Sequence, residues 1–142
     1  AAFLGAEHVT IVECDSDTIE ILQQNVKDVE GDAMCTILEA TINGSPLRLD
    51  AAIDMVIMNP PWGVQTPRAD RAFFETIFAM EIPLVHFIHS IDAEHLLPLA
   101  KANGYELHSI YQDDFRLPAA YAHHSKNKAS TRIRCYRLEK KK

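Results

Sequence analysis

An apolar run in the sequence ends in four residues that join hydrogen-bond acceptors to a flat aromatic ring: Asn59, Pro60, Pro61 and Trp62. Pro60 restricts Asn59 to an extended backbone, so the Asn59 side chain and the Pro60 carbonyl point in fixed directions. Two such acceptors can bind the hydrogens of an exocyclic base amine and favour the tetrahedral geometry in which its nitrogen attacks. Trp62 can stack on the same base for about 1–3 kcal/mol. These residues suggest chemistry on a base amine, although they are also ordinary turn formers.

The elements around this tetrapeptide place it at the end of a strand. Residues 54–58 have the composition of a short strand buried on both faces, and the prolines that follow lack the N–H needed to continue a ladder. Open α/β sheets bind ligands at this carboxyl end of their strands. Glu13 ends the first predicted strand and Glu39 follows the second, so we expect both carboxylates to border the same crevice as Asn59. Either glutamate could instead be a solvated strand end or a helix cap.

The remaining periodicity predicts alternating strands and helices. A final pair of strands implies a doubly wound sheet with an antiparallel edge, an α/β fold in one domain over residues 1–139. Pro98 should kink or shorten the last helix. The strands are predicted at residues 8–13, 34–38, 54–58, 84–88, 105–115 and 131–138, and the helices at about 15–27, 70–80 and 92–104.

Composition indicates an ordinary globular protein, with 47% hydrophobic and 24% charged residues among 142. No apolar run approaches the roughly 20 residues of a membrane span. Cys14, Cys35 and Cys135 are odd in number and widely separated, which predicts neither a disulfide framework nor a zinc site. A reducing compartment, cytoplasm or nucleus, fits best. His86, His89 and His95 have no acidic or thiol partner near in sequence, so core or loop positions are expected and no metal site is predicted.

The net charge of −6 hides an asymmetry. Residues 1–114 hold five Lys or Arg against 19 Asp or Glu, a net −14, whereas residues 115–142 hold nine against one, a net +8. The lysines at 140–142 are expected to be a solvated tail. The cations between positions 116 and 128 lie among aromatic residues and histidines, as in a loop that neutralises phosphates. This segment predicts binding to a nucleic acid.

Three segments in order resemble one known family. Val56–Gly63, followed by Asp70 and Phe73, is similar to the Asp/Asn-Pro-Pro-aromatic motif of S-adenosylmethionine-dependent amino-methyltransferases, in particular the family that methylates adenine N6 in small-subunit rRNA. Val12–Ile21 resembles its acidic strand end, and residues 117–128 resemble its C-terminal signature. The resemblance implies a Rossmann-like class I methyltransferase fold, with RNA as substrate. It assigns cofactor binding to Glu13, Cys14, Glu39, Ala40 and Asn59, catalysis to Asn59, Pro60, Pro61 and Trp62, and RNA binding to Arg116, His124, Lys126 and Lys128.

The resemblance has further implications and two departures. Family members work with a small zinc-containing activator subunit on an edge strand, here near residues 34–38, and His89 matches a position near the target pocket. Trp62 replaces the more usual Phe. The first strand and its glycine-rich loop are absent, which leads us to expect the C-terminal part of a longer protein. The alternatives are a non-catalytic module that binds RNA or protein, or an amine methyltransferase acting on DNA or protein.

Overall fold

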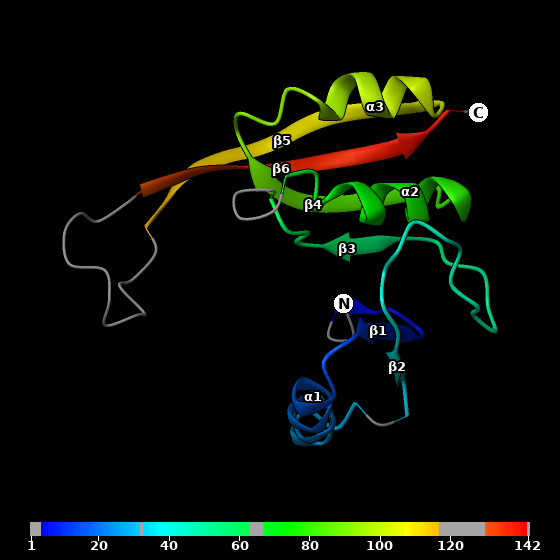
Figure 1. Cartoon of the computed structure of the whole chain (residues 1–142). Helices are drawn as coiled ribbons and strands as arrows, with labels where there is room; N and C mark the ends of the chain where they lie inside the picture. Colours follow the sequence, from blue (N-terminus) through cyan, green and yellow to red (C-terminus); the bar gives the residue numbers. More distant parts are fainter. Residues whose placement is uncertain (1–3, 32, 63–66, 117–129, 142) are drawn as a thin grey trace. The chain divides into compact units, whose positions relative to one another are not determined.

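The structure is a computed structural model that describes residues 4–31, 33–62, 67–116 and 130–141, with the backbone alone at 115–116 and 130–131. The chain divides into two compact units, Ala1–Asn43 and Gly44–Lys142, and each is described by itself. Both combine parallel strands with helices, which confirms the predicted α/β class. Figure 1 shows their elements in order along the chain.

The first unit contains two parallel strands and one helix. Strand β1 (Val9–Glu13) pairs with β2 (Cys35–Glu39), and α1 (Ser16–Asp28) connects them. Asp15 caps α1, because its carboxylate accepts from the backbone N–H of Asp17 at 3.0 Å. The helix buries Ile19 and Val26, whereas Ile21 is exposed.

The second unit is a four-stranded sheet in the order β3-β4-β6-β5. Strand β3 pairs with β4 in parallel, and β6 pairs antiparallel with both β4 and β5. The predicted antiparallel C-terminal pair is therefore confirmed. The strands are β3 (Val56–Met58), β4 (Leu84–Ser90), β5 (Tyr105–Arg116) and β6 (Ser130–Lys140), with helices α2 (Arg71–Ala79) and α3 (Leu96–Ala102).

One face of this sheet carries the core. Val85, Phe87 and His89 alternate along β4 as its buried residues, and the residues between them are only half-buried. Phe74 of α2 and Leu96 of α3 belong to the same buried cluster, so both helices pack on this face. The buried apolar cluster consists of Phe74, Ile77, Ile82, Val85, Phe87, Leu96, Ala100, Tyr105, Tyr136 and Leu138.

Burial of β3 on both faces was a wrong prediction. Ile57 is 65% exposed and Met55 is also exposed. In the described part of the chain β3 pairs only with β4, so it is an edge strand. Ile57 lies opposite His86, on the face away from α2 and α3, which leaves its side chain uncovered.

Two other boundaries differ from the sequence predictions. Helix α3 begins at Leu96 rather than near Asp92, so Pro98 falls in the first turn, where a missing N–H removes no helical hydrogen bond. The shortening expected from Pro98 is thus observed. Lys140, assigned to a tail, ends β6 opposite Tyr105, and its ammonium lies 2.7 Å from the Glu81 carboxylate.

Strands β5 and β6 run on beyond the end of β4. The last pair between β4 and β6 is Ser90 with Ile133, but β5 and β6 stay paired as far as Arg116 and Ser130. This extension is a two-stranded ribbon, formed by the ends of β5 and β6 that lie to the left in Figure 1. Among the described residues, no helix is both long and apolar enough to cross a bilayer.

Candidate active site

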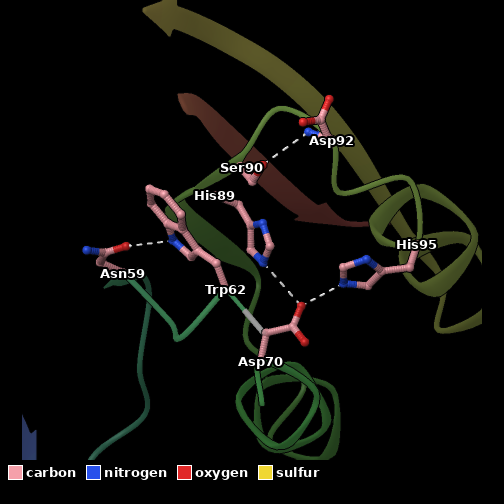
Figure 2. A network of polar contacts seen from close by, with 7 residues as sticks. All are labelled: Asn59, Trp62, Asp70, His89, Ser90, Asp92 and His95. Carbon is pink, nitrogen blue, oxygen red and sulfur yellow. Dashed lines mark hydrogen bonds and ion pairs between the residues drawn. The ribbon is translucent and has the colours of Figure 1, made fainter. Parts of the chain in front are cut away.

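The four residues singled out by the sequence follow β3 directly. Asn59 and Pro61 are exposed, Pro60 is buried and Trp62 is half-buried. The indole N–H of Trp62 donates to Asn59 Oδ1 over 3.1 Å, as Figure 2 shows. The turn therefore brings the amide and the aromatic ring together.

A histidine from β4 supports the indole. The rings of Trp62 and His89 are stacked, with centroids 6.1 Å apart and an interplanar angle of 29°. In Figure 2 the indole lies between Asn59 and His89. Because His89 occupies one side of the ring, a base that stacks on Trp62 would use the other side.

His89 in turn contacts a buried carboxylate from the start of α2. His89 Nε2 lies 3.2 Å from Asp70 Oδ2, and His95 Nε2 lies 2.6 Å from the same oxygen. Asp70 is only 3% exposed and His89 only 1%. Asp70 occupies the N-cap position of α2, yet its side chain makes no capping hydrogen bond and turns to the two histidines instead. A carboxylate only accepts, so both Nε2 atoms carry hydrogen.

Burial decides the charge of His89. Desolvation by burial lowers the pKa of His89, and the nearby His95 lowers it further. The charge and hydrogen bond of Asp70 act in the opposite direction, as does a smaller contribution from the Ser90 backbone. His89 Nδ1 is buried and, among the described residues, has no hydrogen bond of good geometry. We therefore describe His89 as a neutral ring near pH 7, with its Nε2–H directed at Asp70.

This cluster was missed by the sequence analysis, which looked for acidic partners near the histidines in the chain. The atoms that could bind a metal ion lie within 4.8 Å of one another in Asp70, His89 and His95, which is the spacing of a possible metal site. In a tetrahedral zinc site with Zn–N bonds of about 2.0–2.1 Å, however, ligand atoms lie about 3.3 Å apart. The 2.6 Å contact between His95 and Asp70 is the length of a strong charge-assisted hydrogen bond. The geometry fits a hydrogen-bonded carboxylate.

In the first unit, the predicted cofactor residues lie at the carboxyl ends of β1 and β2. Glu13 and Glu39 are register partners, and Ala40 N–H donates to the Glu13 carbonyl at 2.9 Å. Glu13 Oε1 accepts from the backbone N–H groups of Asp15 at 3.0 Å and Cys14 at 2.7 Å. These bonds lower the pKa of Glu13, so this carboxylate is ionised and held in one orientation.

A small open hollow adjoins these strand ends. Its volume is about 350 Å³, and its lining residues are Cys14, Glu39, Ala40 and Thr41. Three of these four were predicted to contact the cofactor, and Thr41 was not. The lining is mainly polar and includes the Glu39 carboxylate, which can accept hydrogen bonds from the hydroxyl and amine groups of a nucleoside.

The predicted RNA-binding residues cannot be placed at this site. Arg116 ends β5, where only the backbone is described. His124, Lys126 and Lys128 lie outside the described residues. Their role stays a prediction.

No protein-family model matches the chain. An uncharacterized protein of Methanocaldococcus jannaschii is 29% identical to it over 145 residues, covering 96% of this chain and 65% of that protein. The chain thus spans a little less than two-thirds of the length of this curated relative.

Solved structures share its fold. A proposed RNA methyltransferase from Pyrococcus horikoshii superposes with a TM-score of 0.79 at 25% identity, covering 98% of this chain and 66% of that protein. A Thermoplasma acidophilum protein gives 0.68 at 25% identity, with 98% and 70% covered. Precorrin-6Y C5,15-methyltransferase from Geobacter metallireducens gives 0.60 at 14% identity, with 94% and 67% covered, a likeness of fold alone. The chain has the Rossmann-like α/β fold of methyltransferases.

Proposed function

We propose that this chain carries the target-base site and part of the cofactor site of an S-adenosylmethionine-dependent methyltransferase acting on adenine N6 of RNA. The observation that carries the proposal is the pairing of Asn59 and Trp62 at the carboxyl end of β3, where the amide and the indole are joined by a 3.1 Å hydrogen bond. A rigid turn thereby presents an acceptor and a stacking surface to the same planar ligand.

The chemistry required of the base site is activation of a weak nucleophile. The adenine amine has its lone pair delocalised into the ring, and acceptors on its two hydrogens favour the tetrahedral, attacking form. Asn59 Oδ1 and the Pro60 carbonyl are the acceptors we assign to these hydrogens. An amide oxygen has two acceptor positions, so Asn59 can keep its bond from Trp62 and still bind the amine. After methyl transfer, the surplus amine proton leaves to water.

The ends of β1 and β2 fit the cofactor by their chemistry. We assign Glu13 to the ribose hydroxyls, because it is an ionised carboxylate fixed by two backbone N–H groups. Glu39 borders the adjoining hollow with Cys14 and Ala40, and we assign it to the adenine amine. When bound, S-adenosylmethionine supplies a methyl group on a positively charged sulfur, a strong electrophile that needs no activation by the protein.

RNA is favoured as the substrate by two facts. The P. horikoshii protein with the same fold is described as a proposed RNA methyltransferase. The last 28 residues carry a net charge of +8, suited to a phosphate backbone. Small-subunit rRNA as the target, with Arg116, His124, Lys126 and Lys128 on its phosphates, rests on the sequence resemblance of the Asn-Pro-Pro-Trp segment and the C-terminal signature.

A zinc-containing activator subunit is proposed on the same basis, at β2. Strand β2 pairs with β1 along one edge, and no described strand pairs with its other edge. An open edge of this kind can accept a strand from another chain. Co-expression with the activator, followed by size-exclusion chromatography, tests this assembly.

The test of function uses the complete gene product with cofactor labelled in its methyl group. Three substrates separate the enzyme classes: a structured small-subunit rRNA fragment, a DNA duplex of the same sequence and a peptide mixture. We expect label on the RNA alone, recovered as N6-methyladenosine after digestion. Label on DNA or peptide alone would assign a different amine methyltransferase. Cofactor affinity too weak to measure by calorimetry would favour a non-catalytic module.

Asn59→Ala separates catalysis from binding. By analogy with other single hydrogen-bonding groups that act in a transition state, we expect the transfer rate to fall about 100- to 1,000-fold. Cofactor affinity should suffer less than it does in a Glu13 variant. Asn25→Ala, at an exposed position of α1, is the matched control. Undiminished turnover in Asn59→Ala would refute the role assigned to this amide.

A further inference from the structure

We propose that Asp70 is a positioning residue of the target-base site: through His89 it fixes the plane of the Trp62 indole, and the indole in turn directs the Asn59 amide. The consequence for catalysis rests on the proposed function. The linkage itself is a property of the folded chain and can be measured without any methyl transfer.

The first link is the burial of Asp70 without a capping role. A buried carboxylate is costly unless charged or hydrogen-bonding groups satisfy it. At the N-cap of α2 the usual solution would be the helix N–H groups, and Asp70 does not use them. Oδ2 accepts from His89 at 3.2 Å and from His95 at 2.6 Å instead. The carboxylate is therefore placed to orient histidines.

The second link is the single anchoring point of the His89 ring. Nε2 contacts Asp70, while Nδ1 has no partner of good geometry among the described residues. Rotation of a histidine ring about its last side-chain bond is soft unless a hydrogen bond fixes it. Asp70 is thus the side chain that sets the plane of His89, and His89 is the ring against which Trp62 stacks.

The third link is the position of Trp62 outside any helix or strand. Its backbone follows the prolines, so the direction of the indole depends on its contacts. Among the described residues, these contacts include the His89 ring on one side and the Asn59 amide at the ring nitrogen. Figure 2 shows the continuous series from Asp70 through His89 and Trp62 to Asn59.

His95 is the second partner of the carboxylate, and it does not touch the indole in any described contact. Its side chain is 53% exposed, and its ring meets that of His89 edge-on at 5.7 Å. Arg134 lies opposite His89 in register, but its guanidinium bonds Gln112 Oε1 and lies over Tyr136. Within the described part of the chain, Asp70 and His95 are therefore the titratable side chains that shift the pKa of His89.

Trp62 is the only tryptophan in the chain, so fluorescence excited at wavelengths that the four tyrosines do not absorb reports on this ring alone. Asp70→Ala releases His89, and we expect the Trp62 emission to shift to the red and quenching by acrylamide to rise at least twofold. His89→Phe keeps a ring beside the indole without the hydrogen bond to Asp70, and should give a smaller change of the same sign. His108→Gln, an exposed histidine far along the sheet, should leave the emission unchanged. Circular dichroism verifies that each variant is folded.

The emission of Trp62, measured as a function of pH, gives a second test. A carboxylate with a purely structural role would not change the midpoint of this profile. A protonated imidazole quenches an adjacent indole, so the emission of the native protein should fall as His89 gains a proton. Asp70→Asn removes the charge that favours the imidazolium and should move the midpoint to lower pH. His95→Gln removes a competing positive charge and should move it to higher pH.

The fluorescence measurements test the positioning role of Asp70, and the kinetic measurements also depend on the proposed function. A folded Asp70→Ala with native emission and quenching overturns the proposal, as does an Asp70→Asn profile whose midpoint is unchanged. If the RNA is a substrate, Asp70→Asn should lower kcat at least tenfold with little effect on cofactor affinity. A loss of kcat together with native fluorescence in both Asp70 variants would also overturn it. Absence of methylation in the native protein defeats the proposed function only, because the fluorescence measurements stand alone.

Discussion

The Trp62 indole donates its N–H to Asn59 Oδ1 over 3.1 Å, so the ring and the amide assigned to one base are joined before any substrate arrives. The bond restricts two groups that would otherwise rotate separately at the end of β3. Preorganisation of this kind lowers the conformational cost of binding a planar ligand. It also makes the two residues experimentally separable, because phenylalanine preserves the ring and removes the donor.

Trp62→Ala should raise the KM for RNA by about 5- to 150-fold, the equivalent of the 1–3 kcal/mol that a base gains by stacking on an aromatic ring. Trp62→Phe should stay within about tenfold of the native protein, because the aromatic surface remains and only the hydrogen bond is lost, at about 0.5–1.5 kcal/mol. Steady-state kinetics with the rRNA fragment measure both. An unchanged KM in Trp62→Ala would remove Trp62 from the base site.

Glu13→Gln should weaken S-adenosylmethionine binding at least tenfold, since a neutral amide accepts hydroxyl hydrogens less strongly than a carboxylate. The backbone bonds lower the pKa of Glu13, so the native protein should hold its cofactor affinity as pH falls from 7 to 5. Calorimetry at the two pH values tests both statements. Glu20→Gln, exposed on α1, is the control and should match the native protein.

His89 should make the protein less stable in mild acid. Its pKa is lowered by burial, so the unfolded chain takes up a proton at a higher pH than the folded chain does. The stability associated with the neutral ring is complete above the ordinary value of about 6.5 and is lost as pH falls below it, by at most about 1.4 kcal/mol per pH unit. Urea unfolding at pH 7.5 and 5.0 measures the difference.

The variant His89→Gln should show a smaller loss of stability over that range. His108→Gln, whose side chain is about half exposed, should keep the native dependence. Equal pH dependence in the native protein and in His89→Gln would contradict the assignment of a neutral buried ring.

Tyr105→Phe should reduce the free energy of unfolding by about 1–2 kcal/mol, because a buried hydroxyl that donates to the Ile82 carbonyl at 3.0 Å is removed. Tyr111→Phe removes a hydroxyl bound to Asp113 on the exposed part of β5 and should change stability by less than about 0.5 kcal/mol. Equilibrium denaturation of the two variants compares them directly. A Tyr105 effect no larger than that of Tyr111 would contradict this account of the core.

Much of the fold follows from the sequence because local signals agree with it. An apolar run such as Val9–Glu13 forms a strand, and an aspartate such as Asp15 commonly caps the helix that follows. The prolines at 60 and 61 end the strand before them. The antiparallel pair of β5 and β6 was likewise apparent from two strand-like segments at the end of the chain. The motif residues were identified because they are contiguous.

The rest depends on packing that no local pattern contains. Asp70 lies 19 residues from His89 and 25 from His95, and only the packing of α2 and the loop before α3 beside β4 brings them together. Read locally, Asp70 is merely a helix start. The exposure of Ile57 has the same origin, since burial of a strand is decided by which neighbours cover it.

Beyond Ser90, β5 and β6 continue as a ribbon without a third strand, from Asp114–Arg116 on one side and Ser130–Arg132 on the other. A two-stranded ribbon twists and bends more readily than a full sheet, and residues 115–142, which include the whole of β6, hold nine of the chain's 14 Lys and Arg residues. Selectivity for a polynucleotide and bond-making at the amine would then belong to separate parts of the architecture. Changes in the ribbon could redirect the protein to a new transcript while Asn59 and its neighbours stay as they are.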